Sequence, residues 1–229
     1  MDPNTEAIIR MAWARTLAVP DDSFSGAAER LDVPSDDATQ VLAVLLGDQC
    51  VLSAPTWAID EAASYSDEAL VSTQGLLRLT RDHAPSRVRS CRLMYADEYV
   101  EDPALESAIV TDDPAALDDL LRRCAPDDVG QTDLRSRSHL FVLLEDETDR
   151  PLAAAAYDDE GGMLADLSVI EAIDARGSGV GALVGAIATN DALDEGLIPQ
   201  LMIDRDVSTE SADALGYVEL GQLARVQVR

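Results

Sequence analysis

The residues best suited to chemistry lie in one glycine-rich segment, VIEAIDARGSGVGALVGAIATN, which spans residues 169–190. Gly177, Gly179 and Gly181 carry no Cβ atom, so an anionic group could approach their backbone closely. The small residues that follow predict a helix, whose first amides are unpaired and carry a partial positive charge. Arg176 adds a guanidinium group for the same anion. The segment therefore predicts a pyrophosphate site at the start of this helix.

Two other interpretations of the segment stay open. Small residues can simply let a helix pack tightly on a sheet, and we expect Gly185 and Ala188 to do only that. The spacing Gly177-x-Gly179-x-x-Ala182 also fits the dinucleotide-binding fingerprint, which would make the ligand NAD. That fingerprint normally opens a long βαβαβ array directly after a strand. Too few residues follow it here to build such an array, so NAD is the less favoured ligand.

The charge of the chain limits its partners. Acidic residues outnumber basic ones 44 to 17, the net charge is −27, and every basic residue is arginine. A field of this sign repels nucleic acids and anionic membranes, so we expect neither as a partner. It could steer a cationic substrate, or it could serve solubility alone. Without lysine the chain has no P-loop, since that motif uses its lysine on the phosphates.

The composition also indicates where the protein works. The three cysteines are far apart and have no metal-ligand spacing, so we expect buried, reduced thiols and no metal site. No apolar run approaches the roughly 20 residues that a membrane span needs. The N-terminus lacks the basic-then-apolar pattern of a signal peptide, and these features together predict a cytoplasmic protein.

Hydrophobic periodicity and turn signals predict an α/β protein with a mixed sheet and two regions, residues 1–103 and 104–229. The first is expected to be an α+β extension, with a helix near 5–18, a hairpin turn at Gly47-Asp48, and one helix that starts at Ser66 and runs through 67–83. A strand should follow at about 86–97. We find no catalytic or binding motif in the sequence of this region.

The second region alternates strands and helices around the glycine-rich segment. Asp113 and Pro114 are typical of a helix start. The stretch 138–170 predicts three strands, Gly196 should end the helix of the glycine-rich segment, and strands should follow at 199–204 and 217–228.

The order of these elements and three local motifs resemble the GNAT superfamily of N-acetyltransferases. ADLSV is similar to the strand before that family's pyrophosphate loop, and ARGSGVGALV follows its Arg/Gln-x-x-Gly-x-Gly/Ala motif position by position. GLIPQLMID and ADALGYVELG resemble its next strand, helix and Leu-Gly-Tyr ending. The resemblance covers about Ser107 to Arg229 and implies a GNAT-like acyltransferase fold.

The resemblance also implies a cofactor, acetyl-CoA, and a reaction with a small-molecule or peptide amine. The pantetheine arm would pair with the backbone of Leu167 and Val169. The pyrophosphate would be held by the loop residues, which are Arg176, Gly177, Ser178, Gly179, Val180, Gly181 and Ala182. In such enzymes a carboxylate or water deprotonates the amine, and a tyrosine often protonates the departing thiolate.

Several positions depart from that pattern. Arg205 replaces the family's frequent asparagine and could contact the cofactor, or it could form a surface pair with Asp204 or Asp206. Ala212 stands in the place of the usual tyrosine. Asp166 is the candidate base, with Glu171 in the following loop as a weaker one. The missing tyrosine leaves a second hypothesis open, a non-catalytic acyl-CoA-binding module, and the assembly state, such as a homodimer, is open as well.

Overall fold

The computed structural model describes residues 1–26 and 29–229, which form two compact units. The first unit comprises Met1 with residues 95–201 and 209–218. The second comprises residues 2–94, 202–208 and 219–229. The chain therefore passes from one unit to the other more than once, and its final strand belongs with the N-terminal residues. The predicted division into residues 1–103 and 104–229 separates this final strand from the N-terminal residues. That division stays a prediction about domains.

The first unit contains a meander of strands with helices on both faces. Its elements are η1 (Pro103–Ser107), β5 (Ile109–Thr111), α5 (Pro114–Leu121), α6 (Pro126–Gln131), η2 (Leu134–Ser136), β6 (His139–Leu144), β7 (Pro151–Glu160), β8 (Leu164–Glu171), η3 (Ile173–Ala175), α7 (Val180–Asp194), the first part of β9 (Ile198–Asp204) and α8 (Glu210–Ala214). The strand order is β9-β8-β7-β6-β5, with β5 to β8 antiparallel and β8 parallel to β9. The three strands expected in 138–170 are thus present.

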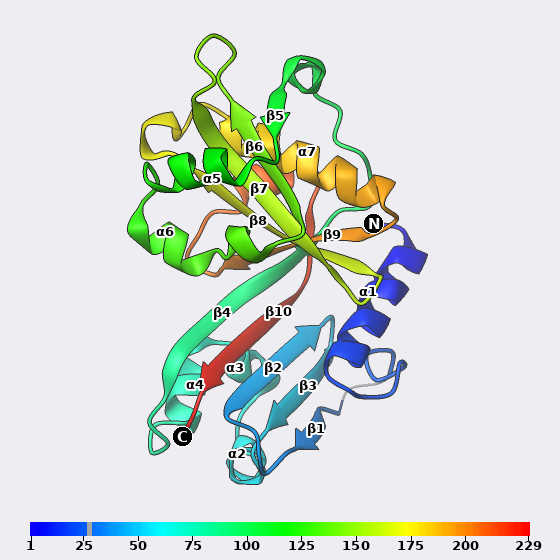
Figure 1. Ribbon diagram of the computed structural model, residues 1–229. Coiled ribbons are helices and arrows are strands. Elements are labelled where there is room, and N and C mark those ends of the chain that lie inside the picture. The colour runs from blue at the N-terminus through cyan, green and yellow to red at the C-terminus, as the bar shows by residue number, and fades with distance from the viewer. Residues whose placement is uncertain (27–28) are drawn as a thin grey trace. The chain divides into compact units, whose positions relative to one another are not determined.

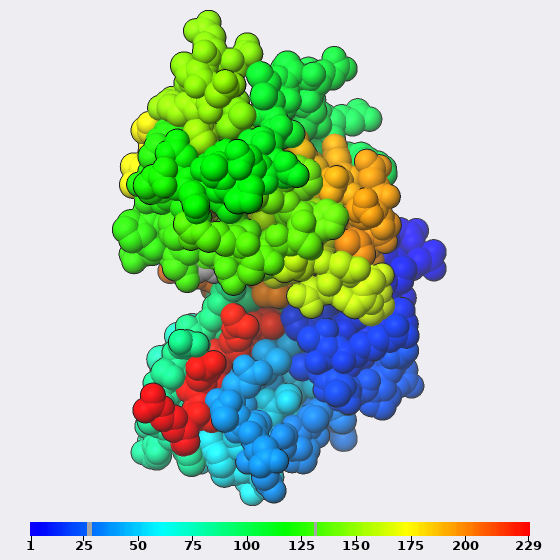
Figure 2. Space-filling model, viewed as in Figure 1, coloured from blue at the N-terminus to red at the C-terminus, as the bar shows by residue number. Residues whose placement is uncertain are grey.

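Two apolar layers hold this unit together. On one face, Leu117, Leu120 and Leu121 of α5 pack against β6–β8, and α5 and α6 cover that face in Figure 2. On the other face, α7 lies along β7 and β8 (Figure 1), with Val184, Ala188 and other small side chains at the contact. Small residues bring a helix close to a sheet, as expected for Ala188.

The second unit is a sheet covered by short helices. Its elements are α1 (Pro3–Thr16), β1 (Leu31–Pro34), β2 (Gln40–Leu46), β3 (Gln49–Ala54), α2 (Thr56–Ala62), α3 (Asp67–Leu70), α4 (Thr73–Leu79), β4 (Ser86–Tyr95) and β10 (Val218–Gln227). The strand order is β1-β3-β2-β10-β4. The hairpin turn at Gly47-Asp48 is confirmed between β2 and β3.

One predicted helix of this unit is wrong. Ser66 does cap a helix, since its hydroxyl accepts the Ala69 amide, but that helix ends at Leu70. Ser72 then caps a second helix by accepting the amide of Gly75. A serine inside a helical pattern can compete for backbone donors in this way, and here it divides the segment into α3 and α4.

The cysteines are as expected. All three are buried and free. Burial raises the pKa of the Cys50 thiol to about 12, so this group stays protonated at neutral pH. Separately, no helix in the described part of the chain is long and apolar enough to cross a membrane.

The close turn between α3 and α4 gives a stability test. A Cβ atom on Gly75 would overlap the carbonyl oxygen of Ala69, which belongs to the backbone and cannot move aside easily. We therefore expect Gly75→Ala to lower the free energy of unfolding by about 2 kcal/mol, as overpacking does. Gly130→Ala is the matched control, because no atom lies within 4 Å of its added Cβ, and it should be neutral or slightly stabilising. Chemical denaturation of the two variants checks this, and equal stabilities would contradict it.

Candidate functional site

The glycine-rich loop connects β8 to α7 by two tight turns. The Ala175 amide donates to the Ala172 carbonyl, and the amide and hydroxyl of Ser178 both donate to the Ala175 carbonyl. Gly177 and Gly179 then adopt positive φ angles of 76° and 86°. Side chains rarely adopt this conformation, so these two positions need glycine whatever binds there. Gly179 is the N-cap, and α7 begins at Val180, close to the predicted start.

The loop presents a row of unused hydrogen-bond donors. Among the described residues, no acceptor is bound by the backbone amides of Gly177, Gly179, Val180, Gly181 and Ala182. A Cβ atom on either Gly177 or Gly179 would meet nothing within 4 Å, so the space in front of them is open. Unpaired amides at a helix start bind anions, because the helix dipole adds to their partial charge. The arrangement can hold a phosphate group.

Gly181 lies next to a side chain of the protein, and its predicted contact with a phosphate stays a prediction. A Cβ atom at this position would overlap the carboxylate of Glu171. The glycine therefore leaves space for a side chain of the protein itself. Glu171 was expected in the loop after this strand, but it is the last residue of β8.

Arg176 is exposed beside the loop, and its guanidinium group forms an ion pair with Asp128 of α6. Two further arginines, Arg123 and Arg150, both pair with Asp174 of η3. The positive charges around the loop are therefore already balanced by carboxylates. The backbone amides remain the free positive feature of this loop.

Strand β8 is paired along its whole length on one side and along only half of it on the other. Its pairing with β7 extends to Glu171, whereas its parallel register with β9 ends at the pair Leu167–Leu201. The Ile198 amide donates to the Met163 carbonyl, so residues of odd number in β8 direct their backbone groups toward the β9 side. Val169 is the first such residue after the pairing ends. Its N–H and C=O can pair with an extended, amide-containing ligand.

Asp166, the candidate base, is held by an arginine. The guanidinium group of Arg137 donates to Asp166 Oδ2 at 2.9 Å and to the Asp166 carbonyl at 2.9 Å. Both side chains are mostly buried, with exposed fractions of 14% for Arg137 and 19% for Asp166. No hydrogen bond to Oδ1 is found among the described residues, so this oxygen can still accept a proton.

The same arginine approaches Asp158, whose Oδ2 lies 3.7 Å from Arg137 Nη1. Burial alone would raise the pKa of Asp158. Hydrogen bonds from the Ser138 amide and hydroxyl, and then the charge of Arg137, outweigh burial and lower the pKa. Arg137 thus compensates two carboxylates on neighbouring strands.

Arg205 belongs to the second unit. Its guanidinium group donates to Gln222 Oε1 at 2.7 Å, and Asp204 pairs with Arg89 instead. The expected surface pair of Arg205 with Asp204 or Asp206 is therefore wrong. Ala212 is buried in α8 and Tyr217 is buried as well, with its hydroxyl 2.8 Å from Thr189 Oγ1.

Sequence reasoning missed one polar side chain near Asp166. Gln200 of β9 is its register partner and is only 2% exposed, yet its Oε1 atom finds no hydrogen-bond partner in the described part of the chain. A buried amide oxygen without a partner is costly in a folded protein. No signal in the sequence separates this glutamine from an ordinary strand residue.

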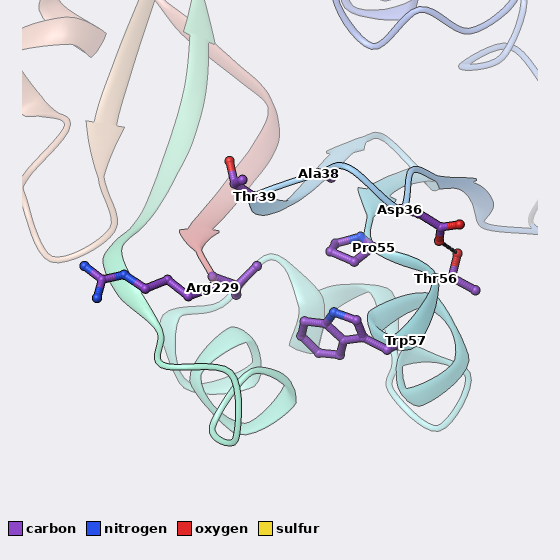
Figure 3. A pocket seen from close by; sticks show the side chains of 8 residues that line it. Asp36, Ala38, Thr39, Pro55, Thr56, Trp57 and Arg229 are labelled. Atoms are coloured by element: carbon purple, nitrogen blue, oxygen red, sulfur yellow. Dashed lines mark hydrogen bonds between the residues drawn. The ribbon is translucent and has the colours of Figure 1, made fainter.

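A small cavity of about 220 Å³ lies in the second unit, and none of the site residues described above lines it (Figure 3). Trp57 and Pro55 line it, and Thr56 donates to Asp36 at 2.5 Å on its rim. The side chain of Arg229 points away from Trp57 (Figure 3). Asp36 and Thr56 are thus paired with each other, and the Trp57 indole is stacked on His83.

The role of Arg137 can be tested by a pH-dependent comparison. We expect Arg137→Gln to lower the free energy of unfolding by about 1–3 kcal/mol at pH 7, because it leaves two carboxylates without their cation. Asp158 has a lowered pKa in the folded state, so the stability it contributes is present above its unfolded pKa of about 3.9 and is lost as the pH falls. The destabilisation should therefore shrink toward pH 3.

Arg135→Gln is the matched control, since Arg135 pairs with Asp118 where both side chains are more than half exposed. Its effect should stay below about 0.5 kcal/mol at every pH. Two results would contradict this role of Arg137. One is equal destabilisation by the two variants, and the other is a destabilisation by Arg137→Gln that increases as the pH falls.

No protein-family model matches the sequence, and no curated protein matches it either. Solved structures do match. A GCN5-related N-acetyltransferase-like protein from Streptococcus suis superimposes with a TM-score of 0.53 at 15% identity, over 98% of both chains. A GCN5-related N-acetyltransferase from Sphaerobacter thermophilus has a TM-score of 0.50 at 15% identity, over 86% of this chain and 62% of the other.

A GNAT-family protein from Novosphingobium aromaticivorans also matches, with a TM-score of 0.50 at 16% identity over 63% of this chain and 67% of the other. For several solved chains, the Sphaerobacter protein among them, the match spans less than two thirds of their length. At these identities the likeness concerns the fold. Together with the parallel pairing of β8 and β9 and the loop before α7, it shows that this chain has the GNAT acetyltransferase fold.

Proposed function

We propose that the protein binds acetyl-CoA and transfers its acetyl group to an amine. One observation supports this most directly, the row of unpaired amides at the start of α7 beside a strand that is open on one edge. The amides suit the pyrophosphate of CoA. The free backbone groups of Val169 suit the amides of its pantetheine arm. NAD would use the amides for its pyrophosphate, but it has no pantetheine arm to pair with the open edge of the strand.

The proposed contacts divide the loop by role. The cofactor's phosphates would be bound by the amides of Gly177, Gly179, Val180, Gly181 and Ala182, and the positive φ angles of Gly177 and Gly179 shape the loop that carries them. Arg176 would then add charge to the polar part of the cofactor, once it leaves its present partner Asp128. A cofactor contact of Arg205, which donates to Gln222 in the second unit, stays a prediction.

For the chemical step we propose Asp166 as the base. Its Oδ1 atom would accept a proton from the amine, directly or through water, while Arg137 fixes the carboxylate. The lone pair of the amine then attacks the thioester carbonyl, the C–S bond breaks, and CoA leaves as a thiolate. Since Ala212 replaces the family's frequent tyrosine, solvent water would supply the proton to that thiolate. An amine, of a small molecule or of a peptide, is the acceptor class that this chemistry requires.

Thermal unfolding with CoA and with NAD tests the cofactor. A ligand at one hundred times its Kd stabilises the folded state by about 2.7 kcal/mol, so CoA should raise the Tm measurably and NAD should leave it unchanged. Gly179→Val should abolish the CoA effect, because its side chain fills the open space and disfavours the positive φ.

Gly196→Val is the matched control for the loop. Gly196 also has a positive φ, of 77°, and open space around it, but it lies beyond the other end of α7. It should lose a similar amount of stability and keep its affinity for CoA. A Tm increase with NAD alone, or unchanged CoA affinity in Gly179→Val, would refute the assignment.

Asp166→Asn tests the chemical step. Release of CoA thiol from acetyl-CoA is followed with a panel of amines, and kcat should fall by a factor of about 100 or more while the Kd for CoA stays the same. A kcat within twofold of the wild type would remove Asp166 from the mechanism. If CoA binds but no amine releases thiol from the wild type, the non-catalytic module is the correct function.

A further inference from the structure

A groove of about 600 Å³ lies in the first unit beside the first half of β6. The register of β5 with β6 ends at the pair Thr111–Val142, so His139, Leu140 and Phe141 have no strand on that side. The start of α5 borders the groove on one face of the sheet, and Asp191 of α7 borders it on the other. A cavity of this size can hold a molecule of drug-fragment size.

The groove has both polar and apolar walls. Its apolar lining residues come from α5, η2 and β6 and are Pro114, Leu117, Leu134, Leu140 and Phe141. Leu117 and Leu134 are buried, whereas Leu140 and Phe141 are half-buried. A ligand in the groove can therefore place an apolar body against Leu140 and Phe141.

The charges at the groove are not balanced. Arg135 is paired with Asp118, and Arg137 is paired with Asp166 outside the groove lining. Asp112 and Asp191 also line the groove, and neither contacts an arginine in the described part of the chain. Two carboxylates without a cation next to an apolar wall favour a positively charged ligand.

Asp191 is held in a defined position. Its Oδ2 atom accepts the hydroxyl of Tyr157 at 2.5 Å and lies 3.6 Å from His139 Nδ1. The rings of His139 and Tyr157 are stacked, with centroids 4.3 Å apart. Burial, followed by the hydrogen bond to Asp191, raises the pKa of Tyr157 well above its usual value, so the tyrosine stays a donor. Because both contacts use Oδ2, the other oxygen is available to a ligand.

We propose that this groove binds a small organic cation, an ammonium group joined to an apolar body. The ammonium would lie at the carboxylates of Asp112 and Asp191, and the body would lie on Leu140 and Phe141. Asp191 lies eleven positions after Val180 in α7, which is about 16 Å along the helix. The groove is therefore separate from the glycine-rich loop, and the proposal does not depend on acetyl transfer.

The experiment measures binding of phenethylamine by isothermal titration calorimetry at low salt, with no CoA present. The neutral control ligand is 2-phenylethanol, which has nearly the same apolar body. We expect phenethylamine to bind at least ten times more tightly than 2-phenylethanol, and we expect this difference to shrink in 0.5 M salt by screening, to about half or less.

Asp112→Asn and Asp191→Asn should each weaken phenethylamine binding by a factor of about three to ten, since each removes one charge. An asparagine at 191 can still accept the Tyr157 hydroxyl, so this variant should fold, and its Tm checks that. Asp146→Asn is the control, because it changes net charge equally in the exposed turn between β6 and β7. It should bind like the wild type.

Two results would overturn the proposal. One is phenethylamine binding that is absent or no tighter than 2-phenylethanol binding. The other is wild-type affinity in both Asp112→Asn and Asp191→Asn, which would place the amine elsewhere. Gly179→Val separates this proposal from the cofactor assignment, since it should keep the phenethylamine affinity whether or not it binds CoA.

Discussion

Strand β8 is paired with β7 along its full length, but it is paired with β9 along only its first half. This one-sided pairing determines the rest of the candidate site. It leaves the Val169 backbone without a partner, and it sends the chain through η3 into α7 at the strand's open end. Helix α7 can pack back on β8 only because small residues face it. A Cβ atom on Gly185 would lie 3.7 Å from the Val169 side chain, so the helix reaches the strand at this point.

Electrostatics in this chain depend on a few arginines that each serve more than one acceptor. Arg137 binds the carboxylate and carbonyl of Asp166 and approaches Asp158. In the second unit, Arg30 pairs with both Asp32 and Asp67. The planar guanidinium group can make several directed bonds at once, which an ammonium group cannot do with the same geometry. With 44 acidic residues, many carboxylates still have no cation, and two of them line the groove beside β6.

The sequence predicted those features that depend on neighbouring residues. The hairpin turn at Gly47 and the cap at Asp113 both follow from local rules, and both are present. Sequence reasoning also placed the three central strands. It missed the second helix cap at Ser72, because a serine in a helical pattern gives the same local signal whether or not it interrupts the helix.

Contacts between distant residues could not be predicted in this way. Glu171 fills the space at Gly181, and Arg137 holds Asp166, only because α7 and β6 lie where packing places them. The His139–Tyr157–Asp191 cluster joins two strands and a helix and has no sequence pattern of its own. The motif therefore indicated where the glycine-rich loop lies, whereas the surroundings of the candidate base could be seen only in the folded structure.

The burial of Cys50, Cys91 and Cys124 has a consequence for the proposed reaction, in which the protein would bind an activated acyl group. Acyl thioesters exchange with accessible thiolates and react slowly with accessible amines. This chain has no lysine, and its thiols lie inside the protein, where burial keeps the Cys50 proton in place. Its surface would therefore resist self-acylation, even at the high local concentration of donor that a bound cofactor creates.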